Sequence, residues 1–400
     1  MKIEKTALLA LGAAMTSGAA LASNTVDKAT PNVLLILVDD LGLGDLSCQY
    51  AKDLSTPNID RIFETGVRLD NFYANSSVSS PSRAALLTGR FPAMVGVPGV
   101  IRPSVDQNWG YFDPSAVTMP EVLKNGGYRT ALIGKWHLGW ESPNLPNERG
   151  FEHFHGFLAD MMDDYYTHRR QGGNYMYLND KEIDPKGHAT ELFTSWSVDY
   201  IKKEAKEKNP FFLYLAYNAP HSPLQPPVEW VNKVQERDKS LPVKRARLIA
   251  LIEHLDYNIG KVIQSLEESG QLNNTLVIFA SDNGGDRGSM ANNGPTRGAK
   301  GDMFEGGIHV ACALNMPGVF EGGRHDNHFV VMMDLMPTIC DFVNVPVKHE
   351  IDGISVLDAI KGKTQNTEDR FVFWLRNEGG AQFCGKSQSA VTVSYTHLRA

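Results

Sequence analysis

Four uninterrupted runs of apolar residues stand out along the chain. They span residues 33–38, 130–133, 211–217 and 276–280, with the sequences VLLILV, TALI, FFLYLAY and LVIFA. A strand with one face in water alternates apolar and polar residues, whereas a strand buried on both faces is apolar throughout. The four runs therefore predict the central strands of a large, mostly parallel sheet.

Three segments with helical spacing lie between these runs. Residues 57–64 start at a proline and stop shortly before a glycine, and 189–208 carry an amphipathic pattern. The longest segment, 243–269, repeats apolar residues at intervals of three and four until Gly270. Strands alternating with helices predict an α/β fold in which helices sandwich the sheet.

Polar and ionisable side chains follow each apolar run. They are Asp39 and Asp40 after the first, Lys135 and His137 after the second, His221 after the third, and Asp282 and Asn283 after the fourth. Ligands of open α/β sheets bind beyond the carboxyl ends of the strands. We therefore expect these side chains to share one site.

Three carboxylates in this set, Asp39, Asp40 and Asp282, would meet at one edge of the sheet, with the amide oxygen of Asn283 beside them. Buried carboxylates need compensation, and a hard divalent cation such as Ca²⁺ or Mg²⁺ prefers oxygen ligands of this kind. The alternative is that DD and SDNG are ordinary Asp-rich turns.

The segment SSPSRAALLTGR at 79–90 predicts a helix with Ser79 at its start. Free N–H groups at a helix N-terminus favour negative charge, and Arg83 lies one turn further on. The alternative is a simple serine cap. Together with Lys135, His137, His221 and Lys300, this helix start would offer several donors to a tetrahedral oxyanion.

Other histidines carry less weight. We expect His254, His309, His325 and His328 to pack or to lie on the surface, and Asp256, on the long helix, to be structural. The four cysteines, at positions 48, 312, 340 and 384, show no metal-binding spacing and are expected to be free thiols.

Composition excludes some classes of function. The 400 residues include 39 Lys+Arg and 46 Asp+Glu, a formal net charge of −7, so nucleic acid is not an expected partner.

Residues 1–22 have the pattern of a secretory signal peptide, with two lysines, an apolar stretch of small residues and the sequence Ala20-Leu21-Ala22. A membrane anchor is the alternative. We expect an exported protein, periplasmic or secreted in a bacterium, with no membrane span after signal cleavage.

These motifs together resemble a type I, formylglycine-dependent sulfatase of the alkaline phosphatase superfamily, over roughly residues 31–360. The segment Ser79-x-Pro81-Ser82-Arg83 followed by AALLTGR is similar to the modification signature of that family, and GKWHLG at 134–139 is similar to its second signature. The sequences VDD at 38–40 and SDNG at 281–284 complete the likeness. Serine rather than cysteine at position 79 is typical of bacterial serine-type members.

The resemblance implies a role for each residue at the site. One Ca²⁺ per chain would be bound by Asp39, Asp40, Asp282 and Asn283, with residue 79 completing the shell. A separate serine-oxidising maturase would convert Ser79 to formylglycine (3-oxoalanine), and Arg83 would stabilise it. Lys135, His221 and Lys300 would hold the sulfate, with His221 as proton donor to the leaving oxygen and His137 assisting the aldehyde hydrate.

The expected activity is hydrolysis of sulfate esters, of sulfated carbohydrates or aryl sulfates. Two alternatives remain: a phosphatase or phosphonate monoester hydrolase on the same scaffold, and a non-catalytic protein that binds sulfated glycans. Region 141–188 is predicted to be long loops with small strands. There His168, Arg169 and Arg170 would contact sugar hydroxyls and a neighbouring anionic group, and Tyr165, Tyr166 or Trp140 would stack on a sugar face. The alternative is that these residues only pack the loop.

Three parts are expected along the chain. These are the signal peptide at 1–22, a catalytic domain at 23–345, and the start of a smaller C-terminal antiparallel subdomain at 346–400. Residues 371–375 (FVFWL) would be one strand of this subdomain. We expect it to be truncated, because Ser394–Ala400 show no sign of completing its sheet.

Overall fold

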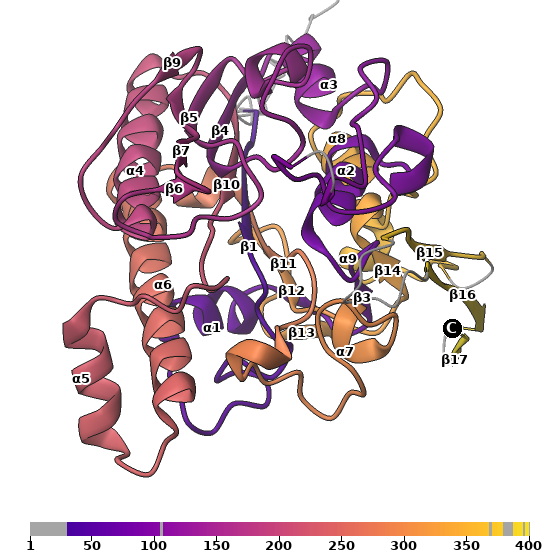
Figure 1. Cartoon of the computed structure of the whole chain (residues 1–400). Helices are drawn as coiled ribbons and strands as arrows, with labels where there is room; N and C mark the ends of the chain where they lie inside the picture. Colours follow the sequence, from indigo (N-terminus) through magenta and orange to yellow (C-terminus); the bar gives the residue numbers. More distant parts are fainter. Residues whose placement is uncertain (1–29, 105–106, 368–369, 379–386, 395–396, 400) are drawn as a thin grey trace, which may run out of the picture.

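The computed structural model describes residues 30–104, 107–367, 370–378, 387–394 and 397–399, with β-strands at the centre and helices outside (Figure 1). The predicted signal peptide and Cys384 lie outside the described residues. Within them, no helix combines the length and apolar character needed to cross a membrane.

A sheet of ten strands forms the centre of the fold, in the order β13-β2-β12-β11-β1-β10-β4-β5-β8-β9. Its five central strands are parallel: β11 (Thr275–Ser281), β1 (Asn32–Val38), β10 (Phe211–Ala216), β4 (Arg129–Lys135) and β5 (His153–Phe157). The four apolar runs thus form adjacent strands, as predicted. Antiparallel pairing occurs only towards the edges among the described strands, which makes the sheet mixed.

The outer strands are shorter. They are β2 (Val67–Leu69), β12 (Cys312–Asn315) and β13 (Arg324–Asp326) at one edge, and β8 (Met176–Leu178) and β9 (Lys181–Glu182) at the other. Two small ribbons pair β3 (Phe72–Tyr73) with β14 (Val330–Val331), and β6 (Arg169–Arg170) with β7 (Gly173–Asn174). Region 141–188 therefore holds small strands as expected, but β5 within it joins the central sheet.

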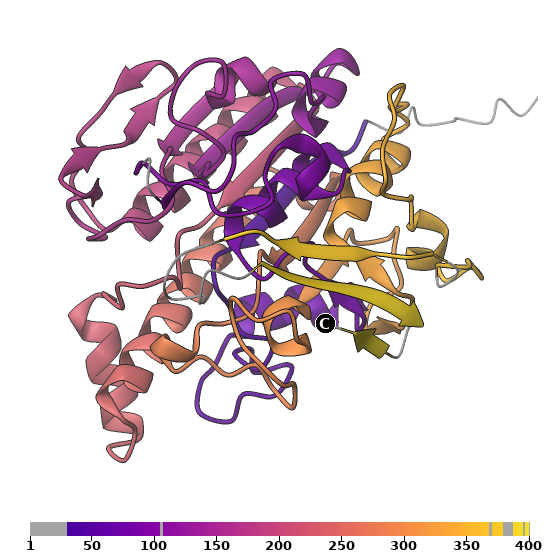
Figure 2. The same ribbon diagram turned by 45° about the vertical axis from the view of Figure 1, so that its right-hand side comes forward.

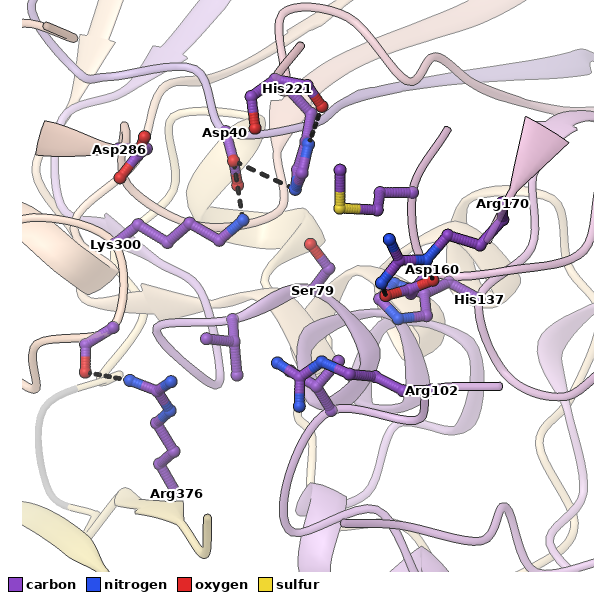
Figure 3. A pocket seen from close by; sticks show the side chains of 15 residues that line it. Asp40, Ser79, Arg102, His137, Asp160, Arg170, His221, Asp286, Lys300 and Arg376 are labelled. Atoms are coloured by element: carbon purple, nitrogen blue, oxygen red, sulfur yellow. Dashed lines mark hydrogen bonds and ion pairs between the residues drawn. The ribbon is translucent and has the colours of Figure 1, made fainter. Parts of the chain in front are cut away.

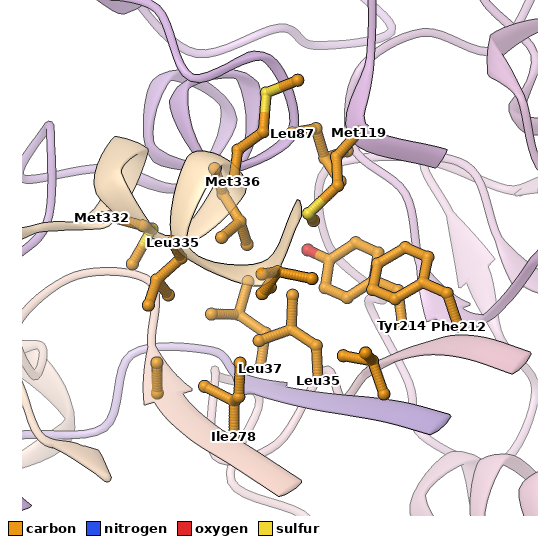
Figure 4. Packing of buried hydrophobic residues seen from close by; sticks show 14 of the residues in the cluster. Leu35, Leu37, Leu87, Met119, Phe212, Tyr214, Ile278, Met332, Leu335 and Met336 are labelled. Carbon is orange, nitrogen blue, oxygen red and sulfur yellow. The ribbon is translucent and has the colours of Figure 1, made fainter. Parts of the chain in front are cut away.

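Alternate residues of each central strand face opposite layers of helices. Leu34 and Ile36 belong to the core beneath α1 (Pro57–Glu64), α4 (Ala189–Glu207) and α6 (Val243–Glu268), with α5 (Val228–Arg237) packed on α6. Leu35 and Leu37 face α2 (Ser79–Thr88), α3 (Met119–Asn125) and α8 (Leu335–Phe342). Figure 4 shows this second core, in which Leu35 and Leu37 point towards the helical layer.

Short helices fill the connections. They are α7 (Glu305–Ile308), α9 (Leu357–Ile360), and the 3-10 turns at Pro92–Val95, Pro146–Arg149, Leu272–Asn274, Arg287–Ser289 (η5) and Met332–Asp334. On the long helix, Asp256 accepts hydrogen bonds from the Asn58 and Ile59 backbone N–H groups at the start of α1, at 3.0 and 2.7 Å, and His254 contacts Glu191 at 3.1 Å. Both residues are structural, as expected.

The C-terminal segment forms a separate antiparallel sheet of β15 (Phe373–Arg376), β16 (Gln388–Ser394) and β17 (His397–Arg399) (Figure 2). Residues after Ser394 add one short strand to this sheet, because β17 pairs with β16. A three-residue edge strand has too few positions to display an alternating pattern in the sequence. Trp374 anchors β15 to the main fold, donating from Nε1 to the Ala74 carbonyl oxygen at 2.7 Å.

Candidate active site

The carboxyl ends of β1 and β11 bring the predicted acidic residues together. Val38 and Ser281 are paired in the parallel ladder, so the residues that follow them emerge side by side. The backbone N–H of Asp40 donates to Asp282 Oδ1 at 3.2 Å, and Asn283 Nδ2 donates to Asp40 Oδ1 at 2.8 Å. Asp40 has a φ of 66°, a left-handed conformation that residues other than glycine adopt rarely and that is concentrated at functional sites.

Ser79 is the first residue of α2, and its hydroxyl faces the acidic residues. Its Oγ lies 3.0 Å from Asp39 Oδ1 and 3.2 Å from Asn283 Oδ1. Val78 occupies the cap position, so the alternative of a simple serine cap does not hold. Helix α2 ends as predicted at Gly89, whose φ of 64° fits a left-handed C-cap.

Three cations surround the three carboxylates. Lys135 Nζ lies 2.6 Å from Asp39 Oδ2, Lys300 Nζ lies 2.7 Å from Asp40 Oδ2, and Arg83 Nη2 lies 2.8 Å from Asp282 Oδ2. Contrary to expectation, the carboxylates need no metal ion for charge compensation, because these pairs already balance the formal charge.

Lys300 reaches the site through a close approach of two backbone segments. Its backbone N–H donates to the Gly285 carbonyl oxygen at 3.0 Å, and the N–H of Gly301 donates to the Ser77 carbonyl oxygen at 2.9 Å. A Cβ at Gly284 would lie 1.9 Å from the carbonyl oxygen of Gly306, so a side chain there would push this loop away.

Burial and neighbouring charges shift the pKa values of the acidic pair in opposite directions. Burial alone would raise the pKa of Asp39, but Lys135, His221 and Arg83 hold it well below its ordinary value. Burial and the charge of Asp39 raise the pKa of Asp282 to about 7, against the opposing effect of Arg83. Without a bound cation, one negative charge is therefore firmly held at Asp39 and the second is weakly held.

The two histidines at the site are oriented by carbonyl groups. His221 Nδ1 lies 2.6 Å from the Ser222 carbonyl oxygen, and its Nε2 lies 3.5 Å from Asp40 Oδ2. His137 Nε2 lies 3.0 Å from the Ile101 carbonyl oxygen, which leaves its buried Nδ1 without a partner among the described residues. Burial lowers the pKa of both rings, helped by Lys300 for His221 and by Lys135 for His137, so both are neutral near pH 7.

A cavity of about 360 Å³, here called the site cavity, opens in front of Ser79 (Figure 3). The predicted site residues Asp40, His137, His221 and Lys300 line it. Five further charged residues, which were not predicted at the site itself, also line it: Arg102, Asp160, Arg170, Asp286 and Arg376. Arg83, Lys135, Asp39, Asp282 and Asn283 lie behind this surface and are buried. The structure thus brings all the predicted site residues together in two layers.

Of the residues predicted to contact a sugar, only Arg170 lines the site cavity. Arg170 lines the site cavity, held by Asp160 at 2.7 Å, whereas Arg169 pairs with Asp184 at 2.9 Å and does not line it. Tyr165 is buried and its Oη donates to the His221 carbonyl oxygen at 2.8 Å, so it positions the His221 segment and does not stack on a ligand.

The remaining loop residues also have other contacts. His168 is buried and its Nε2 lies 3.0 Å from the Gly187 carbonyl oxygen, while Trp140 lines a different cavity, next to Ile101 and Tyr111. Tyr166 is exposed and packs edge-on against His188. His309 stacks on Tyr73, as expected for a packing residue.

The donors at the site fit a hard divalent cation. Asp39 Oδ1, Ser79 Oγ and Asn283 Oδ1 are neighbouring oxygens, and carboxylate oxygens of Asp39 and Asp40 lie within 4.8 Å of each other and of a ring nitrogen of His221. Oxygen-rich sets of this kind suit Ca²⁺ or Mg²⁺ better than zinc, which favours nitrogen and sulfur.

Comparison with known proteins identifies the family. The sulfatase family profile matches residues 31–345, which include every residue of the two layers except Arg376. The chain belongs to the sulfatase family. Among curated relatives of this sulfatase chain, mouse arylsulfatase J (Mus musculus) is 32% identical over 350 residues, which is 84% of this chain and 57% of that protein. Human N-acetylgalactosamine-6-sulfatase (Homo sapiens) is 30% identical and covers 87% of this chain and 69% of its own length.

Solved structures share the fold of this sulfatase chain. Ps i-CgsB in complex with k-i-k-neocarrahexaose superposes with a TM-score of 0.84 at 30% identity, covering 91% of this chain and 82% of that one. The phosphonate monoester hydrolase SpPMH from Silicibacter pomeroyi has a TM-score of 0.65 at 18% identity, covers 90% of this chain and 85% of its own, and shares the fold alone. The predicted alkaline phosphatase-like architecture is therefore confirmed.

Proposed function

We propose that this sulfatase-family chain hydrolyses sulfate esters at the site cavity, with Ser79 as precursor of the nucleophile. The observation that carries the proposal is the position of the Ser79 hydroxyl, at the start of α2, next to Asp39 and Asn283 and facing a cavity lined by Lys300 and His221. Once formed from Ser79, a formylglycine hydrate would supply one hydroxyl to attack sulfur and a second to release sulfate.

The residues that line the cavity and the buried residues behind them would have different roles. Lys300 and His221, which line the site cavity, would contact the sulfate oxygens, and the first N–H groups of α2 would favour charge that develops at residue 79. Arg83 and Lys135, which are buried, would hold the carboxylates of Asp39 and Asp282 in position. We propose Asp39, Asp40, Asp282 and Asn283, with residue 79, as ligands of one Ca²⁺.

The histidines would move protons. His137 lines the cavity, and its Nδ1 has no partner among the described residues, so it would take a proton from a hydroxyl at residue 79. His221 is neutral in the free protein. To act as the proton donor to the leaving oxygen, it would first have to gain a proton, which a sulfate dianion or ester nearby would favour.

We infer a sulfated carbohydrate as the substrate class. N-acetylgalactosamine-6-sulfatase and the neocarrahexaose complex of Ps i-CgsB name carbohydrates for relatives that are about 30% identical. Three arginines, Arg102, Arg170 and Arg376, line the cavity beside the scissile position, as an anionic saccharide would need. We further propose that the protein is exported by a bacterium and matured by a serine-oxidising enzyme.

The test is coexpression with a serine-oxidising maturase, followed by peptide mass spectrometry across residue 79 and assays on 4-nitrophenyl sulfate and 4-nitrophenyl phosphate. We expect a mass loss of two hydrogens at Ser79 and release of nitrophenol from the sulfate ester. A preference for the phosphate ester would favour the phosphatase alternative. Modified protein that hydrolyses neither ester nor any sulfated saccharide would refute the proposal.

A further inference from the structure

A second cavity continues from the site cavity. This distal cavity has a volume of about 750 Å³ and shares Ser222 and Asp286 with the site cavity. Val243, Lys244 and Arg247, from the first two turns of α6, form another part of its wall. Cavities of roughly 300–1,000 Å³ hold small ligands, so both are large enough to be binding sites. A chain-like ligand at Ser79 could therefore extend over Asp286 to α6.

The first turn of α6 is rigidly anchored. Arg245 pairs with Asp45 at 2.6 Å and with Asp53 at 2.8 Å, and donates to the Met290 carbonyl oxygen at 3.2 Å. This last contact ties α6 to the loop that carries η5, and α6 and η5 are in contact. Since Lys244 and Arg247 flank Arg245, their backbone is fixed before any ligand binds.

Lys244 and Arg247 are exposed, and neither has a carboxylate within 4.0 Å among the described residues. Nearby Arg245 and Arg287 do have acidic partners. The N-terminus of α6 adds partial positive charge, because its cap residue is a proline that offers no side-chain acceptor. This end of the distal cavity is therefore cationic.

Asp286 lies between the two cationic ends. Its carboxylate accepts from Ser289 Oγ at 2.7 Å and from the Gly288 N–H at 3.1 Å, and an ionised carboxylate retains further acceptor positions. It would repel an anion placed directly on it but would accept a hydrogen bond from a hydroxyl. Along the two cavities, the carboxylate of Asp286 thus separates the cationic residues of the site cavity from those at the start of α6.

We propose that the distal cavity binds a second anionic group of the same saccharide chain, through Lys244 and Arg247. The preferred ligand is then an oligosaccharide or polysaccharide with a sulfate at the site cavity, a hydroxyl-bearing unit over Asp286, and another sulfate or carboxylate at α6. This inference rests on the proposed function, because it extends the substrate class of the same site. A preference for longer saccharide chains would then depend on residues that lie outside the catalytic site.

Binding without turnover tests the inference separately from the activity. Full-length Ser79→Ala protein is titrated calorimetrically with the disaccharide and hexasaccharide of two series, carrageenan and heparin. The variant Lys244→Ala/Arg247→Ala is compared with a charge-matched control, Lys206→Ala/Lys239→Ala. Both control residues are exposed and line neither cavity.

We expect the hexasaccharide of at least one series to bind more tightly than its disaccharide. The Lys244→Ala/Arg247→Ala change should weaken hexasaccharide binding about tenfold, since two charge-assisted contacts are lost, while disaccharide binding changes less than about twofold. Added salt should shrink the difference. No length dependence in either series, equal losses for both lengths, or an equal loss in the control would overturn the inference. A failure of the proposed function would appear instead as absent turnover of every ester by protein modified at residue 79.

Discussion

Glu378 follows the C-terminal strand β15 and pairs with Arg376, which lines the site cavity, so its replacement gives a quantitative test. Its Oε1 accepts from the Val100 N–H at 3.0 Å, and its Oε2 accepts from Arg376 Nη2 at 3.0 Å and lies 3.7 Å from Arg102. Arg376 also donates from Nη1 to the Gly301 carbonyl oxygen at 2.7 Å, next to Lys300. Glu378 and Arg376 therefore tie together two segments that line the site cavity.

The expected loss of unfolding free energy follows from the burial of the Arg376–Glu378 pair. The side chains of Arg376 and Glu378 are 4% and 1% exposed, so the Glu378→Ala change removes one member of a buried ion pair. Breaking such a pair costs roughly 3–5 kcal/mol of unfolding free energy. The Val100 N–H also loses its acceptor, which brings the expected total to the upper part of that range. Glu378→Gln keeps an acceptor for Val100 and should cost about half as much.

Urea unfolding measures the loss, with Asp358→Ala as the control, because Asp358 and Lys363 are paired on the surface with both side chains more than half exposed. The control should leave the unfolding free energy unchanged within error. The double variant Arg376→Met/Glu378→Leu should recover part of the stability, since an apolar pair leaves no buried charge although the Val100 N–H still lacks its acceptor. Activity per folded molecule on an aryl sulfate should fall about tenfold or more in Glu378→Ala, because Lys300 adjoins the released segment.

A Glu378→Ala protein as stable as the Asp358→Ala control would refute this account of the Arg376–Glu378 pair. A double variant that is less stable than Glu378→Ala would do the same, because the loss would then come from packing and not from an unpaired charge.

Three further predictions concern the site and the core. Ser79→Ala should fold normally by circular dichroism yet lose about 10³-fold or more in turnover, and a smaller loss would exclude residue 79 as the nucleophile. Removal of divalent ions by chelation should abolish activity and lower the melting temperature, and adding Ca²⁺ should restore both. In Asp39→Asn, neither chelation nor added Ca²⁺ should change the activity or the melting temperature. Full activity of the unsubstituted protein after chelation would contradict the metal assignment. Burial raises the pKa of Cys340 to about 12, so this thiol should stay unmodified by iodoacetamide at pH 8 until the protein is unfolded, and rapid native labelling by mass spectrometry would contradict its burial.

The central strands and long helices could be predicted from sequence because burial on both faces leaves a clear local pattern. The run at 33–38 became β1 with one added residue, and 57–64 matched α1 at both ends. The edge strand β17 was missed, because pairing at an edge depends on a neighbour far along the chain and needs only a few residues.

The site was predictable to the extent that strand order determines it. Once β1 and β11 are parallel neighbours, Asp39 and Asp282 must emerge together, and no other information is needed. Arg102 and Arg376 carry no such signal, since they reach the cavity from a loop and from the C-terminal sheet.

The sequence also could not show which cations pair with which carboxylates, and this pairing changes the argument for a metal. Three carboxylates balanced by Arg83, Lys135 and Lys300 need no ion for charge neutrality. The case for Ca²⁺ therefore rests on the oxygen geometry around Ser79, and a bound ion would have to compete with lysine for Asp39 and Asp40. That competition would free Lys300 to turn from Asp40 towards an oxyanion in the cavity, which links ion binding to substrate binding through one side chain.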